Sequence, residues 1–262
     1  MRSRRRHAGD TTLDDNEPGY FLPHPSGKKY IYVNGNNSPE RQRFTVCHEL
    51  AHIILGLPSD HQQVPSWNYA KKSENEMFCD IFAAELLLPY GLFKPLAEKL
   101  PMSLSSVDEL AAKFVTSTMA TGSRFAVVRK APCAFVLSEK GKVRYASRST
   151  GLRDAGAWIP PRFEVPQGSI SAKLRAGTPC DGREEIEADE WFQHWERGGT
   201  LLEEARHLER WDQTLTLLWF EDEEVPAENR RVWENSSQSQ EDAELLPELD
   251  GVLRFHSKKK RR

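Results

Sequence analysis

Two histidines four residues apart, His48 and His52, place the strongest constraint on how this chain can fold. They lie in a segment that predicts a helix from Ser38 to Leu55, because Ser38 suits the N-cap, proline follows it, and Gly56 suits the position after the end. Side chains four apart on a helix point the same way, so both imidazoles can bind one ion. The alternative is an ordinary half-buried histidine pair. The segment is apolar nearly all round, however, and burying these groups without a partner would be costly.

Glu49 lies between these histidines and completes the H-E-x-x-H arrangement of zinc peptidases. In such a site zinc lowers the pKa of water to about 7 and polarises the scissile carbonyl. We therefore expect Glu49 to be the catalytic base, which takes a proton from water and later delivers it to the leaving amine.

A catalytic zinc ion needs a third protein ligand and an open position for water. A second helix, predicted over residues 74–88, offers five candidates: Glu74, Glu76, Cys79, Asp80 and Glu85. Glu76, Cys79 and Asp80 share one face of this helix, whereas Glu74 and Glu85 point away. We expect Glu76 to be the third ligand and Asp80 to accept the free ring N–H of a zinc histidine. Cys79 is the rival ligand, although a thiolate would make the site resemble a structural one.

The tetrahedral intermediate of peptide hydrolysis needs a second donor to its oxyanion. Candidates are Tyr90, Arg41 and His61. Arg41 faces the same side of the helix as His48, two turns earlier, and its favoured role is an ion pair that holds the helix. Residues 29–33 (KYIYV) predict a strand, and we expect it to be the sheet edge on which an extended substrate is added.

Two stretches carry a resemblance to a known family. RQRFTVCHELAH begins at Arg41 and EMFCDIFAAELLLP begins at Glu76, and both resemble the motifs of the ImmA/IrrE metallopeptidases. Residues 19–23 and 30–34 are similar to the segment before the family's active helix. The resemblance is specific over residues 19–89 and fades through about residue 128.

The resemblance implies that His48, His52 and Glu76 are the zinc ligands and that Glu49 is catalytic. Family members are cytoplasmic bacterial or phage proteases. They cut a helix-turn-helix repressor and so switch on genes for stress response or mobile-element transfer.

The chain departs from the family pattern at a few positions. Cys47 and Cys79 stand where alanine is usual, and Asp80 stands where asparagine is usual. Members usually have a helix and a strand before the region that begins here at Gly19, and this chain begins too late to include them in full.

Composition excludes some classes of function. The net charge of -3 over 262 residues implies no general attraction to nucleic acid, although basic residues cluster at both ends. The four cysteines are not spaced like a disulfide framework, no apolar run is long enough to span a bilayer, and no secretory signal is visible. We therefore expect a soluble cytoplasmic protein with free thiols.

The expected fold class is α+β. We predict a zincin-like metallopeptidase domain, with a small sheet and packed helices, over residues 19–100. A helical subdomain similar to a helix-turn-helix would follow at 101–130, and a small mixed α/β C-terminal domain at 131–224. A basic N-terminal arm (1–18) and a polar tail (225–262) would flank these parts.

Local patterns add detail to the C-terminal half. Residues 133–147 predict a β-hairpin and residues 214–220 a strand, whereas residues 187–195 predict a helix. Residues 150–182 are rich in proline and glycine and are expected to form a boundary or a long loop.

Two other classes of function remain open. The chain could be a regulatory protein that binds DNA or a partner, with a vestigial or structural metal site, or a member of a toxin–antitoxin-like pair. Arg124, Arg129 and Lys130 of the second helix in the helical subdomain could reach DNA. The intact Glu49 favours the enzyme, because a purely structural ion has no use for it.

Overall fold

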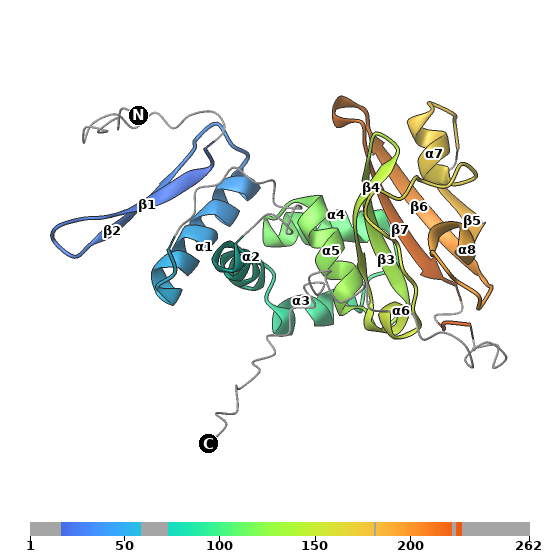
Figure 1. The fold of residues 1–262 in the computed structure, drawn as a ribbon, viewed down its shortest axis with the longest axis horizontal. Coiled ribbons are helices and arrows are strands. Elements are labelled where there is room, and N and C mark those ends of the chain that lie inside the picture. The colour runs from blue at the N-terminus through green and yellow to red at the C-terminus, as the bar shows by residue number, and fades with distance from the viewer. Residues whose placement is uncertain (1–16, 59–72, 181, 222–223, 227–262) are drawn as a thin grey trace, which may run out of the picture. The chain divides into compact units, whose positions relative to one another are not determined.

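The chain forms two compact units in a computed structural model that describes residues 17–58, 73–180, 182–221 and 224–226. The first unit is Met1–Leu87 and the second is Leu88–Arg262 (Figure 1). Nearly all of the predicted arm and tail, and His61, lie outside the described residues. Within the described part, no helix combines the length and the apolar character needed to cross a bilayer.

The first unit consists of a hairpin and two helices. Strands β1 (Gly19–Pro23) and β2 (Lys29–Val33) pair antiparallel, with Gly19 opposite Val33. Helix α1 (Pro39–Leu55) contacts both strands and packs along α2 (Glu74–Leu87). Gly19 allows the hairpin to approach α1 closely, because a Cβ there would lie closer than 3.0 Å to the Thr45 side chain. The predicted strand at residues 29–33 is thus β2 of a two-stranded sheet.

The ends of α1 follow the sequence signals. The Ser38 hydroxyl accepts a hydrogen bond from the Arg41 backbone N–H, and Pro39 occupies the first helical position. Gly56 adopts the left-handed conformation (φ 66°, ψ 26°), and its N–H donates to the His52 carbonyl. The predicted helix is therefore confirmed, including both of its ends.

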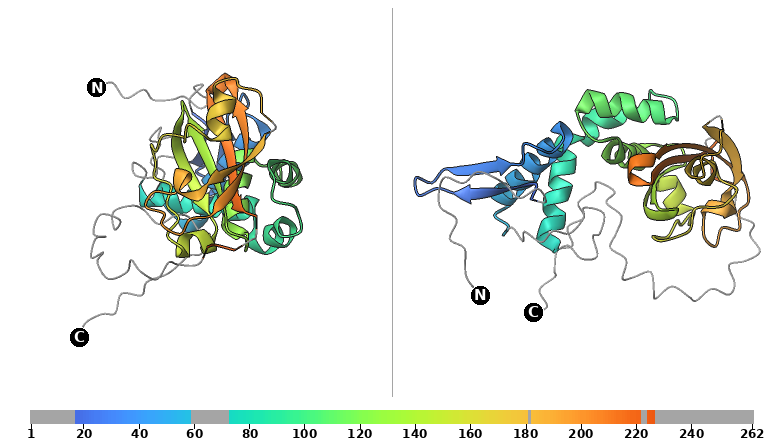
Figure 2. Two further views of the ribbon diagram at one scale, coloured as in Figure 1. Left: turned by 90° about the vertical axis from the view of Figure 1, so that its right-hand side faces the viewer. Right: turned by 90° about the horizontal axis from the view of Figure 1, so that it is seen from above.

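The second unit is built on a five-stranded antiparallel sheet in the order β4-β3-β7-β6-β5. Its strands are β3 (Cys133–Glu139), β4 (Lys142–Arg148), β5 (Arg183–Glu187), β6 (Thr200–Leu208) and β7 (Gln213–Phe220). The predicted hairpin is β3–β4, and the predicted strand at 214–220 is β7. Strand β3 is buried on both faces, since helices cover the sheet on both sides (Figures 1 and 2).

Neighbouring residues of β3 show how the two faces are covered. Phe135 meets Gly122 of α5 (Thr118–Val128), whereas Ala134 and Val136 belong to a core cluster with Trp191. Three short helices contribute residues to the cluster with Trp191: α6 (Thr150–Asp154), α7 (Ile170–Arg175) and α8 (Ala188–Trp191). The sheet therefore has a separate hydrophobic core on each side.

Helices α3 (Tyr90–Ala97) and α4 (Leu104–Phe114) precede α5 in the same unit. The basic residues of the α5 segment make internal contacts. The Arg124 guanidinium donates to the Leu88 carbonyl at 3.1 Å, and that of Arg129 donates to the carbonyls of Ala97 and Leu100. Arg129 is buried. These two guanidinium groups thus stabilise the second unit through hydrogen bonds to its backbone. Helix α5 itself packs on strands β3 and β4.

Two local predictions for the C-terminal half were correct only in part. Residues 150–182 contain α6 and α7, which are too short for a helical periodicity to appear in the sequence. Residues 187–195 are helical only over 188–191, because Phe192 returns to extended backbone and His194 adopts a positive φ. The acidic β5 (REEIE) was missed, since its charges suit an edge strand but hide the strand pattern.

We expect Gly122→Ala to destabilise the second unit, although alanine favours helices by about 1 kcal/mol over glycine. The added Cβ would lie closer than 3.0 Å to ring atoms of Phe135, which is fully buried and has little room to move. Overpacking of this kind costs about 1–3 kcal/mol. Denaturant unfolding followed by tryptophan fluorescence tests this, with Gly91→Ala as control, because a Cβ on Gly91 in α3 meets nothing within 4 Å. Equal stability of Gly122→Ala and wild type would contradict the packing argument.

Glu203 places a carboxylate in the core of the second unit, where it is 1% exposed. One of its oxygens accepts from the Ser171 backbone N–H at 2.9 Å and from the Ser171 hydroxyl at 2.5 Å, and the other accepts from the Trp191 indole N–H at 3.2 Å. Burial raises the pKa of Glu203, and these hydrogen bonds oppose the change without cancelling it. The network joins β6, α7 and α8.

This raised pKa predicts a pH-dependent contribution to stability. A carboxyl group with a raised pKa in the folded state contributes most below its unfolded pKa, and that contribution is lost as the pH rises through the folded value. We expect the free energy of unfolding of wild type, relative to Glu203→Gln, to fall as the pH rises above the ordinary value of 4.5. Denaturant titrations at several pH values measure this difference. The exposed Glu190→Gln serves as control, and a flat difference for Glu203→Gln would contradict the assignment.

Candidate metal centre

Helix α1 presents His48 and His52 on one face, one turn apart, as the sequence predicted. The His52 side chain is completely buried, and that of His48 is 13% exposed. Aromatic rings lie beside both: Phe21 stacks near His52 at 6.4 Å between ring centroids, and Phe44 lies 6.0 Å from His48. These neighbours restrict the movement of the imidazoles.

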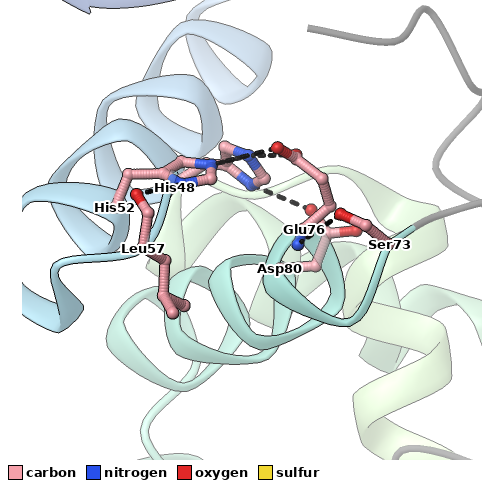
Figure 3. Close-up of polar contacts among 6 residues, drawn as sticks. All are labelled: His48, His52, Leu57, Ser73, Glu76 and Asp80. Carbon is pink, nitrogen blue, oxygen red and sulfur yellow. Dashed lines mark hydrogen bonds and ion pairs between the residues drawn. The ribbon is translucent and has the colours of Figure 1, made fainter. Parts of the chain in front are cut away.

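Helix α2 brings two carboxylates to the same place. Near its start, the Glu76 backbone N–H donates to the Ser73 hydroxyl at 3.5 Å. Glu76 and Asp80, one turn apart, both face the histidines (Figure 3). Ala51, Cys79 and Ala83 are fully buried in α1 and α2. Small side chains of this kind let two helices approach closely, so residues distant in sequence can meet.

The distances within this group match the needs of one tetrahedral ion. The Nε2 atoms of His48 and His52 are 3.2 Å apart. Glu76 places one oxygen 3.0 Å from Nε2 of His48 and the other 3.3 Å from Nε2 of His52. Ligands of tetrahedral zinc at bond lengths of about 2.0–2.1 Å stand about 3.3 Å from one another. Among the described residues, these three form the group of histidine, cysteine and acidic side chains that could hold a metal ion.

The other nitrogen of each ring is engaged elsewhere. Nδ1 of His48 lies 2.9 Å from an Asp80 oxygen, and Nδ1 of His52 lies 3.3 Å from the Leu57 carbonyl oxygen. Both partners are acceptors, so each can bind the Nδ1 proton of a ring whose Nε2 faces a cation. Two Nε2 lone pairs and a carboxylate then face each other at about 3 Å, an arrangement that only a cation makes favourable. The residues present therefore fit a metal ion.

The pKa of His48 reflects the same concentration of negative charge. Burial by itself lowers this pKa, but the hydrogen bonds and charges of Asp80 and Glu76 outweigh burial and raise it to about 9. The acids that favour a protonated His48 would equally favour a metal ion at the same place, so proton and metal would compete.

The structure also positions the remaining candidate residues of the first unit. Glu49 is buried, with 4% of its surface exposed. Burial, together with the charges of Glu76, Asp80 and Glu49, raises the pKa of Cys79 to about 12, so Cys79 is a neutral thiol beside the site. Desolvation lowers the pKa of Arg41, and the charge of Asp80 opposes this change.

The other two candidates for the oxyanion donor, Tyr90 and His61, are not among the described residues of the first unit. Tyr90 belongs to the second unit, where its hydroxyl accepts a hydrogen bond from the Lys94 ammonium at 2.9 Å. His61 lies outside the described residues. The ligand role of His48, His52 and Glu76, the orienting role of Asp80 and the catalytic role of Glu49 stay predictions that this geometry supports.

Sequence reasoning missed the contact of His52 with the Leu57 carbonyl. Its signal was present in Gly56, which predicts that the backbone turns back at the end of α1. The contact of Phe21 with His52 was also missed, because the sequence does not say how the hairpin lies on α1.

Comparison with known proteins agrees with this geometry. Residues 8–126 match the family model described as the IrrE N-terminal-like domain. This match, over a little under half of the chain, supports membership of the ImmA/IrrE family. A protein of Deinococcus deserti named radiation response metalloprotease IrrE is 26% identical over 156 residues, which cover 57% of this chain and 53% of the relative. A protein of the same name from Deinococcus radiodurans is 29% identical over 160 residues, or 57% of this chain and 47% of the relative.

The chain thus spans about half the length of the IrrE proteins it matches. A solved structure described as a Mycobacterium tuberculosis transcriptional regulator aligns with 82% of this chain and 67% of its own, at 15% identity and a TM-score of 0.48. The matched IrrE-like region, residues 8–126, contains the whole candidate metal centre.

We expect Asp80→Ala to weaken zinc binding by about 10- to 100-fold, because the Nδ1–H of His48 loses its acceptor. Asp80→Asn should bind zinc within a few-fold of wild type, since its amide oxygen can accept the same hydrogen bond. Competition with a chromophoric chelator measures both affinities. Unchanged affinity in Asp80→Ala would show that this carboxylate does not orient the ligand.

Proposed function

We propose that this chain is a zinc-dependent endopeptidase, and that its substrate is a helix-turn-helix transcriptional repressor. The observation that carries the proposal is the meeting of His48, His52 and Glu76 around one point, with the buried Glu49 next to the first ligand. The curated relatives are named metalloproteases, which supports the reaction class.

The donor set favours zinc over harder cations. Two imidazoles and one carboxylate are the protein ligands of many catalytic zinc sites, and they leave a position open for water. Magnesium and calcium prefer ligand sets made of oxygens. His48, His52 and Glu76 would hold the ion, which when bound supplies Lewis-acid polarisation of the scissile carbonyl and activation of water.

The protein's own groups would then perform the proton transfers. Glu49 would accept the proton of the attacking water on its carboxylate and donate it to the leaving amine. Its burial keeps this carboxylate away from bulk solvent. Asp80 would hold His48 with Nε2 directed at the ion. Arg41 would have the structural role of an ion-pair partner, and the charge of Asp80, which raises its pKa, supports this.

The choice of a repressor as substrate rests on the resemblance to the ImmA/IrrE family. Its members act in the cytoplasm, and the four free cysteines of this chain suit a reducing compartment. A role in direct DNA recognition has less support, because the guanidinium groups of Arg124 and Arg129 are bonded to backbone carbonyls of the second unit.

We expect Glu49→Gln to abolish cleavage while it keeps the metal site. Glutamine is similar in shape but cannot accept the proton, so the rate should fall by at least about 100-fold. The assay co-expresses the chain with a repressor encoded by a neighbouring gene and identifies the fragments by mass spectrometry. Zinc content is measured on the same purified proteins.

The exposed Glu74→Gln is the matched control, because it makes the same chemical change in the same unit away from the histidines. It should cleave like wild type. If Glu49→Gln processes the repressor as well as wild type does, the peptidase proposal fails and a regulatory role with a structural ion replaces it. If wild type cleaves a different protein, only the choice of substrate fails.

A further inference from the structure

The turn that ends α1 makes an unusual pair of contacts with His52. Gly56 is left-handed, and its N–H and the Leu57 N–H both donate to the His52 carbonyl, the latter at 3.2 Å. The Leu57 carbonyl lies 3.3 Å from Nδ1 of His52. Residues 52 and 57 are therefore linked by two hydrogen bonds that run in opposite directions. One joins the two backbones, and the other joins the His52 ring to the Leu57 carbonyl, as Figure 3 shows.

The ring contact matters because the His52 side chain has no exposed surface. A buried ring N–H without an acceptor costs about 1–3 kcal/mol, and water has no access to it here. The Leu57 carbonyl can only accept, so it favours the His52 tautomer that carries the proton on Nδ1. With the proton on Nδ1, the lone pair of Nε2 points at Glu76 and His48.

Two residues of the sequence fix the direction of this carbonyl. Gly56 supplies the positive φ that brings the chain back toward His52, and residues with a side chain adopt that φ at a cost. Pro58 restricts the residue before it to extended backbone, which limits the orientation of the Leu57 carbonyl. The carbonyl is therefore held from both sides before any metal arrives.

We propose that the segment Gly56–Leu57–Pro58 is a positioning element of the metal centre, in which the Leu57 carbonyl sets the tautomer and the orientation of His52. This inference rests on the proposed function only in taking His48, His52 and Glu76 as metal ligands. It assigns to a backbone turn a role that a helix cap alone would not have.

The chemistry of the two orienting groups differs in a way that suits the site. His48 is oriented by the carboxylate of Asp80, whereas His52 is oriented by a neutral carbonyl. Glu76 and Asp80 already place two carboxylates against the histidines, and a further acid at the His52 ring would add repulsion between buried charges. A neutral carbonyl provides the orientation without that repulsion.

Zinc binding by variants of the full chain tests the proposal. In Gly56→Val the β-branched residue disfavours the left-handed conformation, and we expect zinc affinity to fall by about 10- to 100-fold. Gly56→Asn should stay within a few-fold of wild type, because asparagine tolerates that conformation. Pro58→Ala changes an exposed residue and should weaken zinc binding by a few-fold without disturbing the fold. Affinity is measured by chelator competition on protein whose folding is checked by circular dichroism.

Gly177→Val is the matched control. Gly177 follows α7 of the second unit, has a φ of 73° and has nothing within 4 Å of an added Cβ, as is also true of Gly56. It should lose stability and keep wild-type zinc affinity. Long-range proton–nitrogen NMR of the imidazoles adds a direct readout, with the proton of His52 on Nδ1 in wild type and distributed over both nitrogens in Gly56→Val.

The outcomes separate this proposal from the peptidase proposal. If Gly56→Val and Pro58→Ala bind zinc as tightly as wild type, the turn is only a helix cap and the inference is overturned, even if the chain cleaves a repressor. If Gly56→Val does not fold, Pro58→Ala and the NMR signal of its His52 decide the matter. If zinc affinity falls as expected but wild type cleaves nothing, the positioning role stands and the peptidase proposal fails.

Discussion

The first unit depends on the close approach of two imidazole nitrogens and one carboxylate. The Nε2 atoms of His48 and His52 stand 3.2 Å apart, and Glu76 reaches both. Lone pairs and negative charge at that spacing repel one another unless a cation lies among them. The raised pKa of His48 has the same cause, because the acids that favour a protonated ring also favour a metal ion beside it. Metal binding and the packing of α1 on α2 are thus coupled, because each helix supplies part of the ligand set.

The geometry of this centre is set by groups that do not face the ion. Asp80 and the Leu57 carbonyl occupy the two Nδ1 atoms, and Phe21 and Phe44 lie beside the rings. Each of these groups restricts the rotation of an imidazole ring, so the two Nε2 atoms already point toward the same place. The region that matches the IrrE N-terminal-like family model contains the whole candidate metal centre.

The second unit is held together by packing on both faces of its sheet, and the two faces are filled by residues of very different sizes. Gly122 lets α5 lie against Phe135, while Trp191 fills the opposite core and donates to the buried Glu203. On its other side, α5 is tied to the segment around α3, because the guanidinium groups of Arg124 and Arg129 donate to the carbonyls of Leu88, Ala97 and Leu100. A helical pair that resembles a helix-turn-helix in sequence is thereby part of the core structure of this unit.

The sequence by itself determined the features that depend on local backbone chemistry and on residue spacing. These are both ends of α1, the common face of His48 and His52, the face shared by Glu76 and Asp80, and the hairpin β3–β4. Only the tertiary structure decided the contacts between segments distant in the chain. The meeting of Glu76 with both histidines, the covering of His52 by Phe21 and the fit of Gly122 to Phe135 are of this kind. The acidic β5 and the short helices α6 and α7 also escaped prediction, because their local preference is weak and they are held in place by the core they cover. Periodicity specifies which face of an element is buried, but it carries no information on which other element that face will meet.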